Sequence, residues 1–151
     1  MAVLELRLPP RITAPATVRS ALTELPLEES EREAVLLLAS ELVTNCVRHA
    51  GLGSRQRIGL RAHVTDHAVR VEVIDSGTSV GVAMRPPDAT GGWGLCLVDR
   101  IADRWGVIGD VGAHVWFELD RTDHHSGSAH RASEKTASGE DLLGDCVVQA
   151  S

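Results

Sequence analysis

Three polar residues recur every four positions within one largely apolar stretch of the chain: Glu41, Asn45 and His49. In a helix of about 3.6 residues per turn, this spacing places the three side chains in one stripe. Such a stripe would look outward or into a cavity, because the opposite side of the helix packs on the sheet. An ordinary solvated helix face has the same spacing, so spacing alone leaves both interpretations open. The other side of the helix is apolar, with Val35, Leu38, Leu42 and Val47.

A second candidate is Asp75, which ends an alternating apolar segment and is followed by Ser76 and Gly77. Glycine lets the backbone bend away after the strand, which would expose the carboxylate to an amino group of a ligand. The sequence Asp-x-Gly is also common turn chemistry, so taken alone the residue is compatible with a simple turn.

A third candidate is the glycine-rich stretch from Thr90 to Gly94, which directly precedes a segment of helical spacing. Free backbone N–H groups and the positive end of a helix dipole could hold a phosphate there. The stretch is not the dinucleotide-binding fingerprint, because no parallel strand–helix–strand unit surrounds it and the third glycine is missing. A simple hinge is the alternative.

Lysine is almost absent from the chain: of the 15 basic residues only Lys135 is a lysine. A Walker A loop and the eukaryotic-type kinase fold both need a lysine against the phosphates, so both are excluded. Any nucleotide site must therefore hold phosphates without a lysine.

These candidates must be positioned by four strands and three helices. Alternating apolar residues predict strands around residues 4–8, 58–64, 69–74 and 115–119. A short helix should follow the first strand, and a long helix should cover about residues 28–50, with Ser30 to Glu33 as a capping box. The spacing of Leu95, Val98 and Trp105 predicts a helix over residues 94–104, and residues 76–93 read as a mobile loop.

Strict alternation in the strands indicates that one face of the sheet is buried and the other solvated, which favours antiparallel pairing. The predicted fold is a two-layer α/β sandwich, with helices on one face of a mostly antiparallel sheet. We expect one domain over residues 1–121 and a disordered tail over residues 122–151, which contain few apolar residues.

The composition limits the function further. With 151 residues, 43% hydrophobic content and a formal net charge of -6, the chain can bury a core but offers no overall positive field for nucleic acid. No run of residues is apolar enough to cross a membrane, so a soluble, cytoplasmic protein is expected. The chain has three widely spaced cysteines, Cys46, Cys96 and Cys146. We expect them to be reduced thiols, two of them in the core.

Together the candidates form a recognisable order: Glu-x-x-x-Asn on a helix, Asp-x-Gly at a strand end, then Gly-x-Gly opening a helix. This order resembles the Bergerat ATP-binding fold of histidine kinases, gyrases and Hsp90 (the GHKL superfamily) over about residues 3–120. The stretch from Glu41 to Ala50 is similar to the N box of the single-domain anti-sigma-factor serine kinases and their actinobacterial relatives. The most specific parts of the resemblance are Glu41 to Asn45 and the separate stretch from Gly92 to Arg100.

The resemblance implies a role for each matching residue. Asn45 would coordinate Mg²⁺, Glu41 would act as the general base, and Asp75 would receive the adenine amino group of ATP. The remaining nucleotide-binding positions are Gly77, which lets the base approach, and Thr90, Gly92, Gly94 and Leu95 around the phosphates. His114 stands where many relatives carry a threonine near the adenine.

The implied function is an ATP-binding anti-sigma factor that also phosphorylates a serine of an anti-anti-sigma (STAS-type) partner. The alternative is an ATP-gated regulator of the same fold that binds the anti-anti-sigma protein or the sigma factor with little or no transfer. A homodimer is compatible with either. A sandwich that binds no nucleotide is the third hypothesis.

Overall fold

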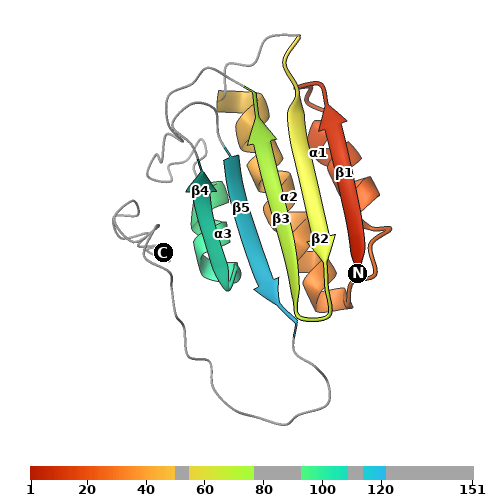
Figure 1. Cartoon of the computed structure of the whole chain (residues 1–151). Helices are drawn as coiled ribbons and strands as arrows, with labels where there is room; N and C mark the ends of the chain where they lie inside the picture. Colours follow the sequence, from red (N-terminus) through yellow and green to blue (C-terminus); the bar gives the residue numbers. More distant parts are fainter. Residues whose placement is uncertain (50–54, 77–92, 109–113, 122–151) are drawn as a thin grey trace.

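The computed structural model describes residues 1–49, 55–76, 93–108 and 114–121. Within them, three helices cover one face of a five-stranded sheet whose strand order is β1-β2-β3-β5-β4 (Figure 1). All four pairings between neighbouring strands are antiparallel, which confirms the predicted two-layer α/β sandwich. The elements are β1 (Ala2–Leu8), α1 (Ala14–Leu22), α2 (Glu29–His49), β2 (Ile58–Val64), β3 (Ala68–Asp75), α3 (Trp93–Ile101), β4 (Arg104–Ile108) and β5 (His114–Asp120).

The alternation in β3 shows how the sheet divides its side chains. Val71, Val73 and Asp75 are buried toward the helices, whereas Arg70 and Glu72 are half-buried on the other face. Because side chains alternate along a strand, the same division runs through the paired strands. The helix-facing side forms the core, and the other face of the sheet is not covered by any described helix (Figure 1).

The long helix α2 supplies the middle of the core. Val35, Leu38 and Leu42 are buried as the sequence predicts, and Val43 and Cys46 join them. Burying a side chain of this size contributes about 1.5–3 kcal/mol relative to leaving it exposed. The helix is therefore held firmly, and its polar stripe has a fixed position relative to the sheet.

The predicted capping box at Ser30 to Glu33 is wrong. Helix α2 begins at Glu29, and the backbone N–H of Glu28 donates to the Glu31 carboxylate at 3.0 Å. The carboxylate that caps the start of the helix therefore belongs to Glu31, whereas the sequence pattern suggested Glu33, two positions later. Arg32 holds the preceding turn, donating to the carbonyl oxygens of Thr23 at 2.5 Å and Leu27 at 2.8 Å.

The predicted helix over residues 94–104 is also wrong at its end. Helix α3 stops at Ile101, and Arg104–Ile108 form the strand β4, which the sequence did not reveal. Trp105 lies in β4 opposite Phe117, and its side chain packs against the core. Its position in the sequence also fits the helical spacing of the residues before it. Its indole N–H donates to the Asp99 carboxylate at 3.1 Å, which ties β4 to α3.

Two further expectations concern thiols and membranes. Cys46 and Cys96 are buried reduced thiols, as predicted, while Cys146 lies outside the described residues. In the described part of the chain, no helix has the length and apolar character needed to cross a membrane. The expected tail over residues 122–151 and most of the loop over residues 76–93 also lie outside the described residues.

Candidate functional site

The site is built where the start of α3 meets the polar stripe of α2. Gly94, in the first turn of α3, faces both Asn45 and Glu41. A Cβ atom at position 94 would lie 3.5 Å from the Cβ of Glu41 and 3.4 Å from the Cγ of Asn45. It would also overlap the side-chain amide nitrogen of Asn45. Two of the three sequence candidates, which are about fifty residues apart, are thus brought into contact.

The polar residues of this part of α2 fall into two kinds. Ser40 and Thr44 turn their hydroxyls back into the helix, donating to the carbonyl oxygens of Leu36 at 2.6 Å and Ser40 at 2.7 Å. Such bonds satisfy a polar side chain locally. Within the described residues, the half-buried side chains of Glu41 and Asn45 form no hydrogen bond of this kind. Their carboxylate and amide ends are therefore not tied back to the helix in the way that Ser40 and Thr44 are.

Asp75 lies at the end of β3 on the side that faces α2. Its side chain is only 6% exposed, which is unusual for a carboxylate. Asp75 also affects Cys46 of α2. Burial, and then the negative charge of Asp75, raise the pKa of the Cys46 thiol to about 12. The end of β3 therefore lies near Cys46, the residue that follows Asn45 in α2.

The strand end is itself pinned. The Ser76 hydroxyl accepts a hydrogen bond from the backbone N–H of Arg57 and donates to the carbonyl oxygen of Arg57, both at 3.1 Å. The Gln56 side-chain amide donates to the carbonyl oxygen of Ser76 at 2.8 Å. These bonds fix the residue next to Asp75, a role that the sequence analysis missed because the partners are about twenty residues away.

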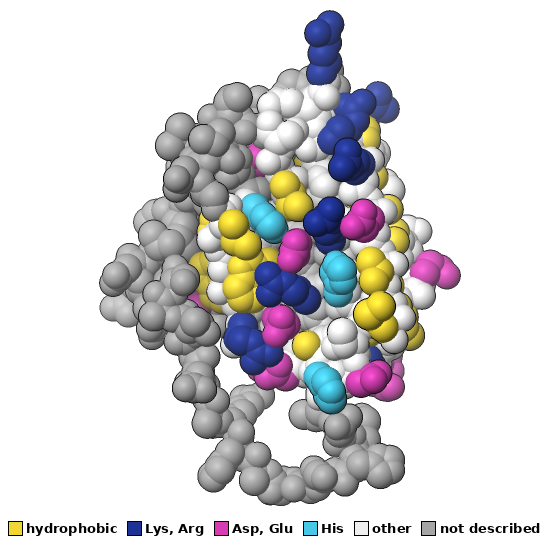
Figure 2. All heavy atoms as spheres, viewed as in Figure 1, with side chains coloured by type: hydrophobic (Ala, Val, Ile, Leu, Met, Phe, Trp, Pro, Cys, Tyr) yellow, Lys and Arg dark blue, Asp and Glu magenta, His cyan; other side chains and the backbone are white. Residues whose placement is uncertain are grey.

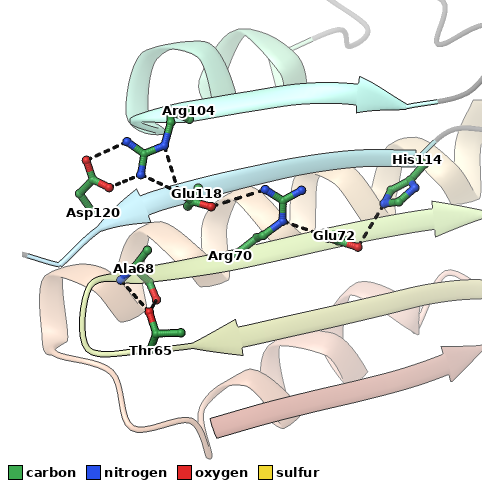
Figure 3. Close-up of polar contacts among 8 residues, drawn as sticks. All are labelled: Thr65, Ala68, Arg70, Glu72, Arg104, His114, Glu118 and Asp120. Carbon is green, nitrogen blue, oxygen red and sulfur yellow. Dashed lines mark hydrogen bonds and ion pairs between the residues drawn. The ribbon is translucent and has the colours of Figure 1, made fainter. Parts of the chain in front are cut away.

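His114 does not belong to this site, contrary to the sequence expectation. Its imidazole contacts the Glu72 carboxylate at 3.2 Å on the uncovered face of the sheet (Figure 3), whereas Asp75 faces the helices. A one-residue difference in register reverses the face on which a strand side chain lies. His114 instead ends a row of polar contacts across β3, β5 and β4. The other members are Glu72, Arg70, Glu118, Arg104 and Asp120.

The remaining predicted residues divide between the described and the undescribed parts of the chain. Leu95 lies in the first turn of α3, and its side chain belongs to the hydrophobic core. Gly77, Thr90 and Gly92 lie outside the described residues, as does the side chain of His49.

The comparison with known protein families decides the identity. A family model described as a histidine kinase-like ATPase domain matches residues 8–119. The chain belongs to the histidine kinase-like ATPase domain family. The match covers all the described elements of this ATPase domain from the end of β1 to β5, including both helices that meet at Gly94.

Among solved structures, the ATPase domain is similar to the crystal structure of the RsbU and RsbW domains of Rv1364c from Mycobacterium tuberculosis. The similarity has a TM-score of 0.62 at 24% sequence identity, and it covers 81% of this chain and 34% of that one. This chain thus spans about a third of the length of that neighbour, and the likeness shows the shared fold. A search of curated proteins found no match.

A magnesium nucleotide fits the residues of this ATPase domain. Among the described residues, no group of three His, Cys, Asp or Glu side chains could enclose a metal ion. Magnesium does not need such a cage, since it is usually held by one or two oxygen ligands together with substrate phosphates. The Asn45 amide can supply such an oxygen, and the absent side chain of Gly94 leaves backbone close beside it.

Proposed function

We propose that the chain is an ATP-binding regulatory protein of the anti-sigma-factor type that phosphorylates a serine of an anti-anti-sigma partner. The observation that carries this proposal is the contact between Gly94 at the start of α3 and the Asn45–Glu41 edge of α2. It joins a helix start suited to phosphates with the oxygen ligand and the carboxylate that phosphoryl transfer needs. Membership of the histidine kinase-like ATPase family supports ATP as the nucleotide.

Within this proposal Asp75 accepts a hydrogen bond from the adenine amino group. Its place at the end of β3, on the side that faces α2, supports this role. Gly77 would let the base approach, while Thr90, Gly92, Gly94 and Leu95 would contribute backbone around the phosphates. Asn45 would hold Mg²⁺, which neutralises phosphate charge when it is bound.

Glu41 is the proposed general base. It lies one helical turn before Asn45 and also faces Gly94, so it stands beside the phosphate end of the site. Its carboxylate would accept the proton of a partner's serine hydroxyl as that oxygen forms its bond to the γ-phosphorus of ATP. The bond to the bridging oxygen breaks, and ADP leaves.

The proposed partners are an anti-anti-sigma protein of the STAS type and a sigma factor. The N-box stretch around Glu41 and Asn45 supports them, since it is similar to that of anti-sigma-factor kinases. A cytoplasmic location, a homodimer, and the division into an ATP-binding domain (residues 1–121) and a tail (residues 122–151) belong to the same proposal.

Isothermal titration calorimetry with Mg·ATP tests the nucleotide part. We expect binding by the natural chain and a loss of at least about tenfold in affinity for Asp75→Asn, since an amide can present its NH₂ to the adenine amino group. Asp66→Asn is the matched control, because Asp66 is an exposed aspartate in the turn between β2 and β3. Absence of heat with the natural chain, or equal affinity of Asp75→Asn, would remove ATP binding from the proposal.

Transfer of labelled phosphate to a purified anti-anti-sigma protein tests the kinase part. We expect Glu41→Gln to bind Mg·ATP normally and to lose transfer by about a hundredfold or more, as expected when a general base is removed. Glu33→Gln, an exposed glutamate on the same helix, should transfer normally. If the natural chain binds ATP without any transfer, the function is that of an ATP-gated binding regulator.

A further inference from the structure

The arginines of the chain are unevenly placed. Five of them lie where β1 and α2 end and where β2 begins, the same end of the molecule at which β3 ends in Asp75. We call this group the basic end. Figure 2 shows Lys and Arg side chains gathered there, at the top of the view. Its members are Arg7, Arg11, Arg48, Arg55 and Arg57, and all five are exposed.

The opposite end of the molecule is acidic. Glu28 and Glu29 lie at the start of α2, and Asp66 lies in the turn between β2 and β3. Glu31 and Asp120 also lie at this end, where they pair with Arg121 and Arg104. The chain as a whole carries a formal net charge of -6. The basic end is therefore locally positive although the chain as a whole is negative. The described charges are separated along the direction of the strands, with arginines at one end and acids at the other.

No described acidic side chain pairs with four of the five arginines of the basic end. Among the described residues, Arg7, Arg11, Arg48 and Arg55 form no ion pair. The nearest carboxylates of the paired strands are committed elsewhere. Asp75 is buried on the helix-facing side, and Glu5 pairs with Arg61 at 2.9 Å.

A nucleotide in the proposed site could not contact all five arginines of the basic end. Arg7 alternates with the core-facing Leu6 and Leu8, so it lies on the uncovered face of the sheet, whereas Asp75 faces the helices. In addition β2 separates β1 from β3, a lateral distance of about 10 Å for two strand spacings. A ligand that engages both Arg7 and Arg48, at the end of α2, must span both layers of the domain.

We propose that the basic end is the docking surface for an acidic segment of a protein partner. Charge complementarity selects this occupant: the chain as a whole is acidic, whereas this end of its described part gathers five exposed arginines. Such a field orients the encounter and raises the association rate more than it adds contact energy. The partner would meet the end of the domain that carries Asp75, so the link to catalysis rests on the proposed function, whereas the docking surface itself does not.

Fluorescence anisotropy of a labelled glutamate-rich peptide with the full chain tests this inference. We expect binding that weakens as salt is raised, and a loss of about tenfold for the double variant Arg7→Glu with Arg55→Glu. Arg19→Glu is the control for the single variant Arg7→Glu, because Arg19 is an exposed arginine on α1, away from the basic end. It should change the affinity by less than about twofold.

Three outcomes would overturn the inference: no binding of the peptide, an equal loss for Arg19→Glu and Arg7→Glu, or tighter binding of a single-stranded oligonucleotide than of the peptide. Circular dichroism and the affinity for Mg·ATP, measured on the same variants, should be unchanged. If the natural chain binds the peptide through the basic end but does not bind Mg·ATP, the proposed function fails while the docking surface stands.

Discussion

The backbone of Gly94 lies against the side-chain amide of Asn45, so closely that no side chain fits at position 94 unless that amide moves. The contact joins the first turn of α3 to the fifth turn of α2. The position of the Asn45 amide is thus set from two directions, by the packing of α2 on the sheet and by the backbone of α3.

Replacing Gly94 with alanine should therefore damage the site and not the fold. The added methyl group must push the Asn45 amide aside, so we expect the affinity for Mg·ATP to fall by about tenfold or more. Alanine is the better helix former by about 1 kcal/mol, which should offset the cost of the clash in the thermal midpoint. Calorimetric titration and thermal unfolding measure the two effects.

Gly59→Ala is the matched control for Gly94→Ala. A Cβ atom at position 59 would meet the Cβ and the carbonyl oxygen of Ile74 at 3.7 Å, which is ordinary contact. This variant should bind Mg·ATP like the natural chain. Equal binding by Gly94→Ala would show that the amide of Asn45 is not part of the nucleotide site.

Replacing Ser76 with alanine should loosen the end of β3. The variant loses the two hydrogen bonds with the backbone of Arg57, which we expect to lower the free energy of unfolding by about 1–2 kcal/mol. Mg·ATP should bind more weakly, because Asp75 precedes the released residue. Urea denaturation and titration check this against Ser30→Ala, an exposed serine in the first turn of α2. A stability change no larger than that of Ser30→Ala would contradict it.

These contacts mark the boundary of what the sequence can reveal. Alternation along β3 and the four-residue spacing of Glu41 and Asn45 are local patterns, and they correctly predict the strand, its buried face and the shared direction of these two side chains. The meeting of Gly94 with Asn45, and that of Ser76 with Arg57, are tertiary contacts between distant segments, which no periodicity reports.

Two of the differences between sequence and structure have local causes. Trp105 satisfies a helical spacing and also faces the core from β4, so the periodicity could not separate a longer helix from a short strand. His114 was placed near the adenine from a motif, but in a strand a shift by one residue reverses the face. Its imidazole accordingly meets Glu72 on the uncovered side.

The Glu72 carboxylate should make stability depend on pH. Burial alone would raise the pKa of Glu72, but hydrogen bonds from Arg70 and His114, and the charges of these partners, outweigh burial and lower it. A carboxyl group with a lowered pKa in the folded state stabilises the fold above its unfolded pKa of about 4.3, and this contribution disappears as the pH falls through the folded value.

Glu72→Gln isolates this contribution. The variant should be less stable than the natural chain by about 1 kcal/mol near neutral pH. The difference should shrink below about pH 4. Urea denaturation across the pH range measures it, and Glu33→Gln, an exposed glutamate on α2, should show no such trend. A constant difference at all pH values would mean that the charge of Glu72 is not involved.

The strand that the sequence did not reveal offers a test of its own. Trp116 on β5 lies across Gly106 on β4: a Cβ atom at position 106 would meet the indole Nε1 at 2.9 Å and two ring carbons at 3.1 Å. The guanidinium carbon of Arg70 lies 4.0 Å from the centroid of the Trp116 ring. Gly106→Ala should lift the ring, weaken this cation–π contact and lower the free energy of unfolding by about 1–3 kcal/mol.

A double-mutant cycle shows whether the clash is the cause. In a Trp116→Ala background the ring is gone, so Gly106→Ala should cost little or should even stabilise β4, because alanine restricts the unfolded chain more than glycine does. Urea denaturation of the four proteins gives the coupling free energy. If Gly106→Ala costs the same in both backgrounds, Trp116 does not lie over Gly106, and the pairing of β4 with β5 must differ from the register Gly106 opposite Trp116.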